Sequence, residues 1–245
     1  MKLSYPKAVS LPLWKKGAFT LGLVGVAVGL AHAAGAAAPA VSAPAASAAP
    51  TPTAMTASPT AAPSATGVPS VVSTTCMACH GMQGISAPDS MFPNLAGQWR
   101  PYLVKQINDF RTHKRADPMA PIMLPMVATL TSAQIQRVTT YFAAQKPNPG
   151  KVYDPQLVAE GKKIFEGGIA KAQVPACMAC HGPTGLGVPP LFPRLAGQRR
   201  TYVIDQLTYF KNGTRANDPH AIMRYIASHL SSQQMTALAA YVRSL

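Results

Sequence analysis

The chain has 245 residues, which is enough for one or two domains. Its formal net charge is +14, from 22 lysines and arginines against eight aspartates and glutamates. A basic chain of this kind can bind nucleic acid. The export signal at its N-terminus argues against that class and favours an acidic protein surface or an anionic membrane face as the partner.

A secretory signal peptide is predicted for residues 1–33. The four lysines of this segment lie within residues 2–16, and an uncharged run follows to Ala31. An A-H-A triplet that ends at Ala33 resembles a cleavage site. The uncharged run is shorter than the ~20 residues of a transmembrane helix. The alanines that continue to Ala40 offer an alternative, which is an uncleaved anchor in the inner membrane. In either case the rest of the chain is exported, and we expect a periplasmic protein.

A tether is predicted for residues 34–70, which are almost all alanine, proline, serine and threonine. Such a segment buries too little apolar surface to offset the entropy cost of ordering it, and its prolines favour an extended spacer. Removing the four lysines of the leader from the 22 basic residues leaves 18 against eight acidic residues, a net charge of +10.

The pentapeptide Cys-Met-Ala-Cys-His occurs twice and contains every cysteine of the chain. Its pattern, C-x-x-C-H, is the attachment signature of a c-type haem, in which two thiols form thioethers with the vinyl groups and the histidine binds the iron. We therefore predict two covalently attached haem c groups. The cysteines are Cys76, Cys79, Cys177 and Cys180, and the iron-binding histidines are His80 and His181.

Two other interpretations of the cysteines fit less well. A four-cysteine zinc site usually has its pairs ~15–20 residues apart, whereas these pairs are about a hundred residues apart. A thioredoxin-like dithiol requires a βαβ context, and no strand-rich pattern surrounds either pentapeptide.

Two helices are predicted in the first domain, residues 71–146, after its haem motif. The first follows an L-A-G-Q turn, where Leu103, Ile107 and Phe110 recur at helical spacing. The second opens with a capping box, in which a hydroxyl at the N-cap is followed by glutamine three residues later. Its defining residues are Thr131, Gln134, Ile135, Val138 and Phe142.

The second domain, residues 154–245, follows a linker at residues 147–153 and opens with a helix that the first domain lacks. Asp154 can cap this helix, Pro155 suits its first position, and a Gly-Gly pair can close it. The later helices repeat those of the first domain. Their defining residues are Val203, Leu207, Phe210, Ser231, Gln234, Met235, Leu238 and Val242.

The two domains are copies of one unit. F-P-x-L-A-G-Q occurs in both at an offset of 100 residues, whereas the cysteines are offset by 101. The helices that follow share four residue types at the same offset of 100. These pairs are Tyr102 and Tyr202, Gln106 and Gln206, Phe110 and Phe210, and Arg115 and Arg215.

The repeat also predicts the second axial ligand of each iron. Met223 is the only methionine between His181 and the last helix, and Met123 is its counterpart at the common offset. Met119 and Met126 have no methionine at the equivalent positions. Methionine as the second ligand gives a relatively high-potential electron carrier, and a second histidine gives a lower potential. An iron with an open face can bind and react with small ligands.

Other residues are weaker candidates. His113, His220 and His229 do not recur in both domains, and surface roles suit them better than iron ligation. The carbonyl of Pro93 or Pro193 can accept the other N–H of the nearby histidine and fix its tautomer. Propionate contacts and ordinary core or surface roles are equally compatible with the remaining candidates. These are Tyr102, Tyr202, Trp99 and Arg199.

From about residue 72 onward the chain resembles the dihaem cytochrome c4 family in its two C-x-x-C-H-G motifs, its repeated F-P-x-L-A-G-Q, its Y-x-x-x-Q-x-x-x-F helices and its late methionines. This resemblance implies an all-α fold of two tandem class I cytochrome c domains, packed with their haems near the interface. It also implies His/Met ligation and passage of electrons to a terminal oxidase.

The leading hypothesis is a periplasmic dihaem carrier that exchanges electrons with redox proteins in a respiratory chain and is not itself an enzyme. The alternative is the cytochrome subunit of a dehydrogenase complex, of the sulfide or alcohol dehydrogenase type. Association with the membrane surface is compatible with both. A dihaem peroxidase would need an open iron face, and two methionine ligands argue against it.

Overall fold

The computed structural model describes residues 67–245, so the predicted signal peptide and most of the predicted tether lie outside the described residues. The described chain is built from helices and has no β-strand; it contains two isolated β-bridges, Ile169–Val174 and Val188–Phe192. The predicted all-α class is confirmed. Among residues 67–245, no helix combines the length and apolar character needed to cross a bilayer.

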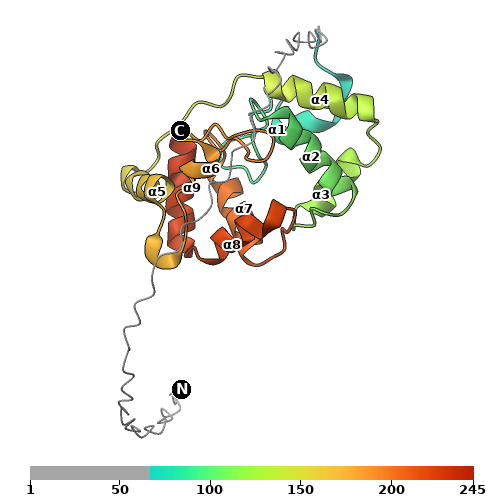
Figure 1. Cartoon of the computed structure of the whole chain (residues 1–245). Coiled ribbons are helices and arrows are strands. Elements are labelled where there is room, and N and C mark those ends of the chain that lie inside the picture. The colour runs from blue at the N-terminus through green and yellow to red at the C-terminus, as the bar shows by residue number, and fades with distance from the viewer. Residues whose placement is uncertain (1–66) are drawn as a thin grey trace, which may run out of the picture. The chain divides into compact units, whose positions relative to one another are not determined.

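The first domain consists of the helices labelled α1 to α4 in Figure 1. A short π-helix, Val72–Cys76, leads directly into the haem motif. The remaining elements are α1, Met77–His80; α2, Arg100–Arg111; α3, Ala120–Val127; and α4, Ser132–Ala144.

The second domain consists of α5 to α9, drawn from yellow to red in Figure 1. Two short 3₁₀ helices, Ala170–Ala172 and Pro219–Ala221, connect its main elements. Those elements are α5, Pro155–Gly167; α6, Met178–His181; α7, Arg200–Lys211; α8, Ile222–Ser228; and α9, Ser232–Ser244.

Local signals define where these helices begin. Both predicted capping boxes form, with the hydroxyls of Thr131 and Ser231 each accepting the backbone N–H of the glutamine three residues later. Asp154 accepts two backbone N–H groups at the start of α5, and that helix closes at Gly168, whose φ of 67° suits glycine. The helices predicted from periodicity correspond to α2, α4, α7 and α9.

The opening helix of the second domain packs closely on the last one. Gly161 of α5 faces the backbone of Ala237 in α9, where an added Cβ would come 2.0 Å from the carbonyl oxygen. The rings of Phe165 and Tyr241 pack against each other in a tilted arrangement, with 5.2 Å between their centroids. Phe165 and Tyr241 belong to the core cluster of the second domain, which also holds Leu230, Met235 and Val242.

In the first domain the π-helix, which is shorter than α5, packs against the inner side of the last helix, α4. Val72, in the π-helix, is fully buried against Leu103, Val138 and Phe142. A second cluster, around Phe110, joins the far ends of α2 and α4 to α3. The sequence did not predict which residues take the place of the missing opening helix in the first domain. Val72 fills part of that space.

Candidate functional site

Each haem motif lies on one turn of helix, α1 in the first domain and α6 in the second. Both helices end at a glycine in a positive-φ conformation, Gly81 at 73° and Gly182 at 76°. Placing the two cysteines and the histidine on a single helical turn leaves the histidine as the last helical residue, with its ring in the protein interior. His80 is 6% exposed and His181 7%.

A backbone carbonyl fixes each histidine ring from behind. The Nδ1 atom of His80 lies 2.9 Å from the carbonyl oxygen of Pro93, and that of His181 lies 2.9 Å from the carbonyl oxygen of Pro193. These contacts confirm the partner expected from the sequence. If Nδ1 carries the proton, Nε2 is left with a free lone pair, as a metal ligand requires.

The environment of the histidines fits a haem iron. The Nε2 atom of His80 is buried and has no hydrogen-bond partner among the described residues, which is costly unless a bound group uses it. Burial lowers the pKa of both His80 and His181, although the proline carbonyls oppose that shift. Neutral imidazole is the form that binds a metal.

The cysteines have the properties of attachment points and lack those of a redox-active dithiol. Burial raises the pKa of the Cys76 thiol to about 11 and that of Cys177 to about 11. Redox-active dithiols depend on a lowered pKa, because the thiolate is the nucleophile. Both pairs are free of disulfides and are partly exposed beside the helix that carries the histidine.

The two candidate methionine ligands occupy equivalent helices. Met123 lies on α3, half-buried against the cluster that contains Phe110, and Met223 lies half-buried on α8, which packs on α7. Met126, one turn after Met123, is 44% exposed. Neither α3 nor α8 was predicted, because α3 contains Pro121 and Pro125 and α8 is only seven residues long.

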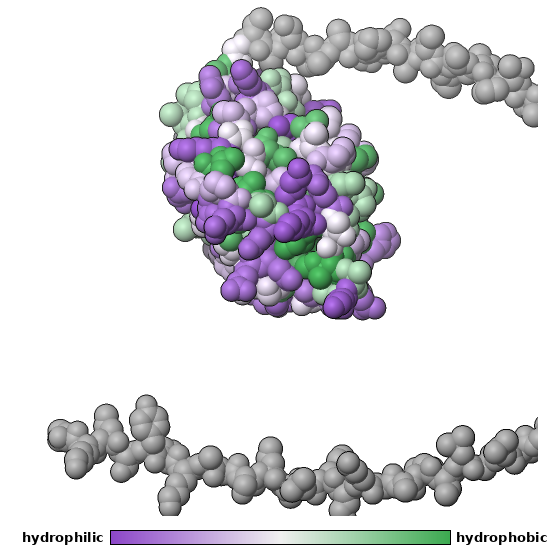
Figure 2. All heavy atoms as spheres, turned by 90° about the vertical axis from the view of Figure 1, so that its left-hand side faces the viewer, coloured by the Kyte–Doolittle hydropathy of each residue, from purple (hydrophilic) through white to green (hydrophobic). Residues whose placement is uncertain are grey.

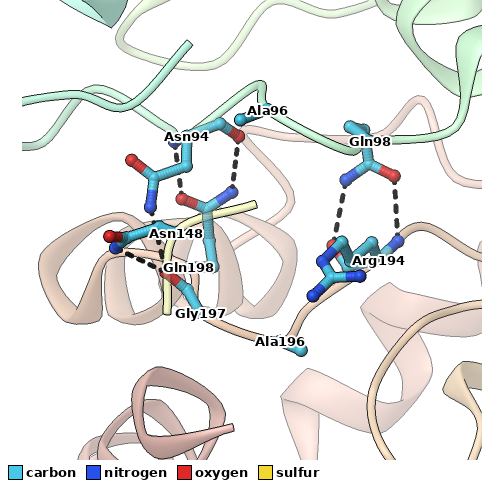
Figure 3. Close-up of a pocket in the computed structure, with 8 residues that line it drawn as sticks. All are labelled: Asn94, Ala96, Gln98, Asn148, Arg194, Ala196, Gly197 and Gln198. Carbon is cyan, nitrogen blue, oxygen red and sulfur yellow. Dashed lines mark hydrogen bonds between the residues drawn. The ribbon is translucent and has the colours of Figure 1, made fainter. Parts of the chain in front are cut away.

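Hydrogen bonds between the two F-P-x-L-A-G-Q segments join the domains (Figure 3). The Gln98 amide donates to the carbonyl of Arg194 and accepts its N–H, both at 2.9 Å. Gln198 makes the same pair of bonds with the backbone of Asn94, at 3.0 and 2.7 Å. The two halves of this contact are made by equivalent residues of the two repeats. Sequence reasoning assigned no role to these amides, although their recurrence in both repeats was visible.

A second polar cluster crosses the interface through the repeated arginines. Arg115 donates to Gln106 in its own domain and to Gln206 in the other, at 2.8 and 2.9 Å. Arg215 likewise donates to Gln206 at 2.7 Å and to Gln106 at 3.1 Å. Both guanidinium groups are buried, at 5% and 4% exposure. Repeated polar residues at helical spacing were the available signal for this cluster.

The cluster differs between the domains at one position. Arg115 forms an ion pair with Asp117 at 2.7 Å, whereas Arg215 bonds the neutral Asn217 at 3.0 Å. Burial by itself lowers the pKa of Arg115, but Tyr202 and Asp117 outweigh it and raise that pKa overall. The first domain therefore holds a buried neutral pair where the second holds a buried cation.

The remaining sequence candidates lie at the same interface. The hydroxyl of Tyr202 contacts Arg115 at 3.4 Å and that of Tyr102 contacts Arg215 at 3.1 Å. Trp99 donates its indole N–H to the carbonyl of Leu186 at 2.8 Å, and Arg199 bonds the backbone and hydroxyl of Ser86. All four side chains make contacts between the domains. His113, His220 and His229 are exposed.

Comparison with known proteins matches one family to two successive regions of the chain. The family described as "Cytochrome c" matches residues 64–146 and again residues 158–245, which together are more than half of the sequence. The chain belongs to the cytochrome c family. It is 46% identical over 179 residues to cytochrome c-552 of Acidithiobacillus ferridurans, covering 72% of this chain and 76% of that protein.

Cytochromes c4 are similar over nearly their whole length. Cytochrome c4 of Pseudomonas aeruginosa is 41% identical over 175 residues, covering 71% of this chain and 85% of that protein. The solved structure of cytochrome c4 from Acidithiobacillus ferrooxidans is 45% identical, with a TM-score of 0.64 over 69% of this chain and 98% of that one. The resemblance to the dihaem cytochrome c4 family is confirmed.

Membership of this family establishes the cofactor and the broad activity. The protein has two tandem cytochrome c domains with two covalently bound haem c groups, and both cysteine pairs fit the attachment motif. It is an electron-transfer protein and not an enzyme. One further relative, named thiosulfate dehydrogenase electron acceptor in Stutzerimonas stutzeri, is 34% identical over 177 residues, covering 71% of this chain and 81% of that protein.

Proposed function

We propose that this protein is a periplasmic dihaem carrier that takes single electrons from an upstream donor protein and passes them, through its two domains, to a terminal oxidase of a respiratory chain. The observation that carries the proposal is the duplication of one histidine site, with the same 2.9 Å contact to a proline carbonyl in both domains. Two such sites joined by buried hydrogen bonds suit transfer between domains that keep a fixed arrangement.

Each domain supplies four residues to its haem. Cys76 and Cys79 would attach the first haem, and His80 and Met123 would bind its iron. The second domain would use the equivalent set, Cys177, Cys180, His181 and Met223. When bound, each haem supplies a one-electron couple between ferric and ferrous iron.

The protein's own residues would keep the ligands unchanged in both oxidation states. The proline carbonyls hold the histidine rings in one orientation, and burial keeps those rings out of water. Thioether sulfur favours ferrous iron, so a methionine on each iron gives a relatively high potential. A site that does not reorganise on reduction suits a carrier better than a catalyst.

The predicted export signal supports the periplasmic location. A leader with lysines before an uncharged run, and an A-x-A-like site, precedes the domains in the sequence. The net charge of +10 without the leader lysines favours an acidic partner surface.

A second candidate is the cytochrome subunit of a dehydrogenase complex. The relative named thiosulfate dehydrogenase electron acceptor favours it, because that protein shares both domains with this chain. Purification from native membranes distinguishes the two. A stoichiometric catalytic chain that stays bound at high salt would contradict the free carrier, whereas a protein that elutes alone supports it.

Replacing the methionines tests the ligand assignment. Met223→Ala should leave both haems covalently attached but remove the methionine-sulfur band of the ferric spectrum from one haem, and lower that haem's potential. Met123→Ala should do the same to the other haem. Met126→Ala is the matched control, because its side chain is 44% exposed and should leave both bands intact. Loss of a band in Met126→Ala, with Met123→Ala unchanged, would overturn the first-domain assignment.

A further inference from the structure

The last helix is covered differently in the two domains. In the second domain α5 lies across α9, with Gly161 against Ala237 and Phe165 against Tyr241 (Figure 1). Residues 67–146 contain no counterpart of α5; α4 packs on α2 through Leu103, and the π-helix covers a further part of its inner side through Val72. The face of α4 that corresponds to the α5 contact is therefore open within the described chain.

This face of α4 carries a charged residue where the equivalent face of α9 carries a small apolar one. Ala237, which is buried under α5, corresponds to Arg137, which is exposed. Its neighbour Gln136 is hydrogen-bonded to Arg100 at the start of α2, so two guanidinium groups lie on adjoining helices. We call Arg100, Gln136, Arg137, Tyr141 and Met82 the α4 strip.

The α4 strip extends toward the haem-attachment segment. The hydroxyl of Tyr141, one turn beyond Arg137, donates to the carbonyl of Met82 at 3.2 Å. Met82 follows the first haem motif by two residues and is 37% exposed; Met77, inside that motif, is 40% exposed. A basic surface therefore adjoins exposed apolar side chains next to the attachment point, which is a suitable composition for a transient redox contact.

The charge of the first domain indicates what covers this strip. Asp109 and Asp117 are buried in ion pairs with Lys105 and Arg115, so Asp89 is the only exposed carboxylate among residues 67–146. Four basic side chains of the same range are exposed. They are Arg100, Lys114, Arg137 and Lys146.

A neutral cover would be unfavourable here. The uncharged stretch that precedes the first domain in sequence has no carboxylate to pair with Arg137, so burying that guanidinium beneath it would cost desolvation energy without compensation. Carboxylates on another protein would satisfy both arginines, and Arg is suited to bidentate pairing with them.

We propose that the α4 strip is the docking surface for an acidic redox protein, and that electrons are exchanged with this partner at the first domain. The proposal rests on the carrier function proposed above. On the face of the second domain where α5 is exposed, hydrophilic and hydrophobic side chains are interspersed (Figure 2), and Lys162 on α5 is paired with Glu166 at 3.9 Å.

The test uses the full-length oxidised holoprotein and, as a probe, a fluorescently labelled peptide of ten glutamates. Arg100→Glu with Arg137→Glu should weaken peptide binding at least about tenfold at low salt, and binding by the unaltered protein should fall steeply as salt rises. The matched control, Lys163→Glu with Lys171→Glu on the second domain, makes the same change in net charge. It should weaken binding by less than about twofold.

The outcomes are distinct. Equal losses in the two double variants would show attraction by net charge alone and would overturn the proposal. So would binding to phosphatidylglycerol vesicles without binding to the peptide. Hydroxyl-radical footprinting checks the free protein, where Tyr141 and Met82 should be oxidised readily and become protected by the peptide. Protection before peptide is added would mean that this chain covers the strip itself. Unchanged haem potentials in Arg100→Glu with Arg137→Glu would separate a failure of docking from a failure of the carrier function.

Discussion

One backbone carbonyl contacts each of the two histidine rings and fixes its orientation. The proline that supplies it lies 13 residues after His80 and 12 after His181, at the start of the F-P-x-L-A-G-Q segment. Sequence reasoning could anticipate it, because the segment recurs with the motif. It could not anticipate the partners of Gln98 and Gln198, because those partners are backbone groups of the other domain.

At the residue scale, the difference between Asp117 and Asn217 predicts a difference in potential. Asp117→Asn removes a buried negative charge beside Arg115, which should favour ferrous iron and raise the potential of the first-domain haem. At the effective dielectric constant of about 20 that suits charges in proteins, the loss of one buried unit charge should shift the potential on the order of tens of millivolts. Asn217→Asp should lower the potential of the other haem.

Spectroelectrochemistry of the two variants measures both shifts. The repeat itself indicates that asparagine fits this position, since Asn217 occupies it in the second domain. Asp89→Asn, at an exposed carboxylate, is the control and should shift neither haem by more than a few millivolts, because water and salt screen it. Shifts of the wrong sign would show that this carboxylate does not tune the iron.

At the scale of elements, helices with a clear periodicity or cap were predictable and the others were not. The capping boxes of α4 and α9 and the cap of α5 lie entirely within short sequence windows. The methionine-bearing helices do not. Pro121 and Pro125 obscure α3, and α8 begins only after His220 and Ala221 adopt left-handed conformations, with φ of 53° and 57°. Tertiary context decides such segments.

The crossing of α5 and α9 gives an element-scale prediction. Gly161→Ala places a Cβ 2.0 Å from the carbonyl oxygen of Ala237, so the helices must separate. Overpacking of this kind should reduce the free energy of unfolding by about 1–3 kcal/mol. Gly167→Ala, in the same helix with nothing within 4 Å, should be neutral or stabilising by up to about 1 kcal/mol. Chemical denaturation of the holoproteins measures both, and equal stabilities would contradict the packing described.

At the scale of the whole molecule, the interface is polar and repeated. The Gln98 and Gln198 contacts and the Arg115 and Arg215 contacts each occur once per domain, in matching form. The sequence could show that the domains are copies, and hence that two haems are present. It could not show how copies with the same residues pair, because that depends on which buried donors meet acceptors across the interface.

The measurement that tests the account most directly is a spectroelectrochemical titration of the purified holoprotein, followed at the haem absorption bands and at the methionine-sulfur band. We predict two reversible one-electron steps, one per domain, with that sulfur band present for both ferric haems and no change of ligand on reoxidation. A single haem, a step that is irreversible, or a ferric haem without the sulfur band would contradict a carrier with two equivalent histidine–methionine sites.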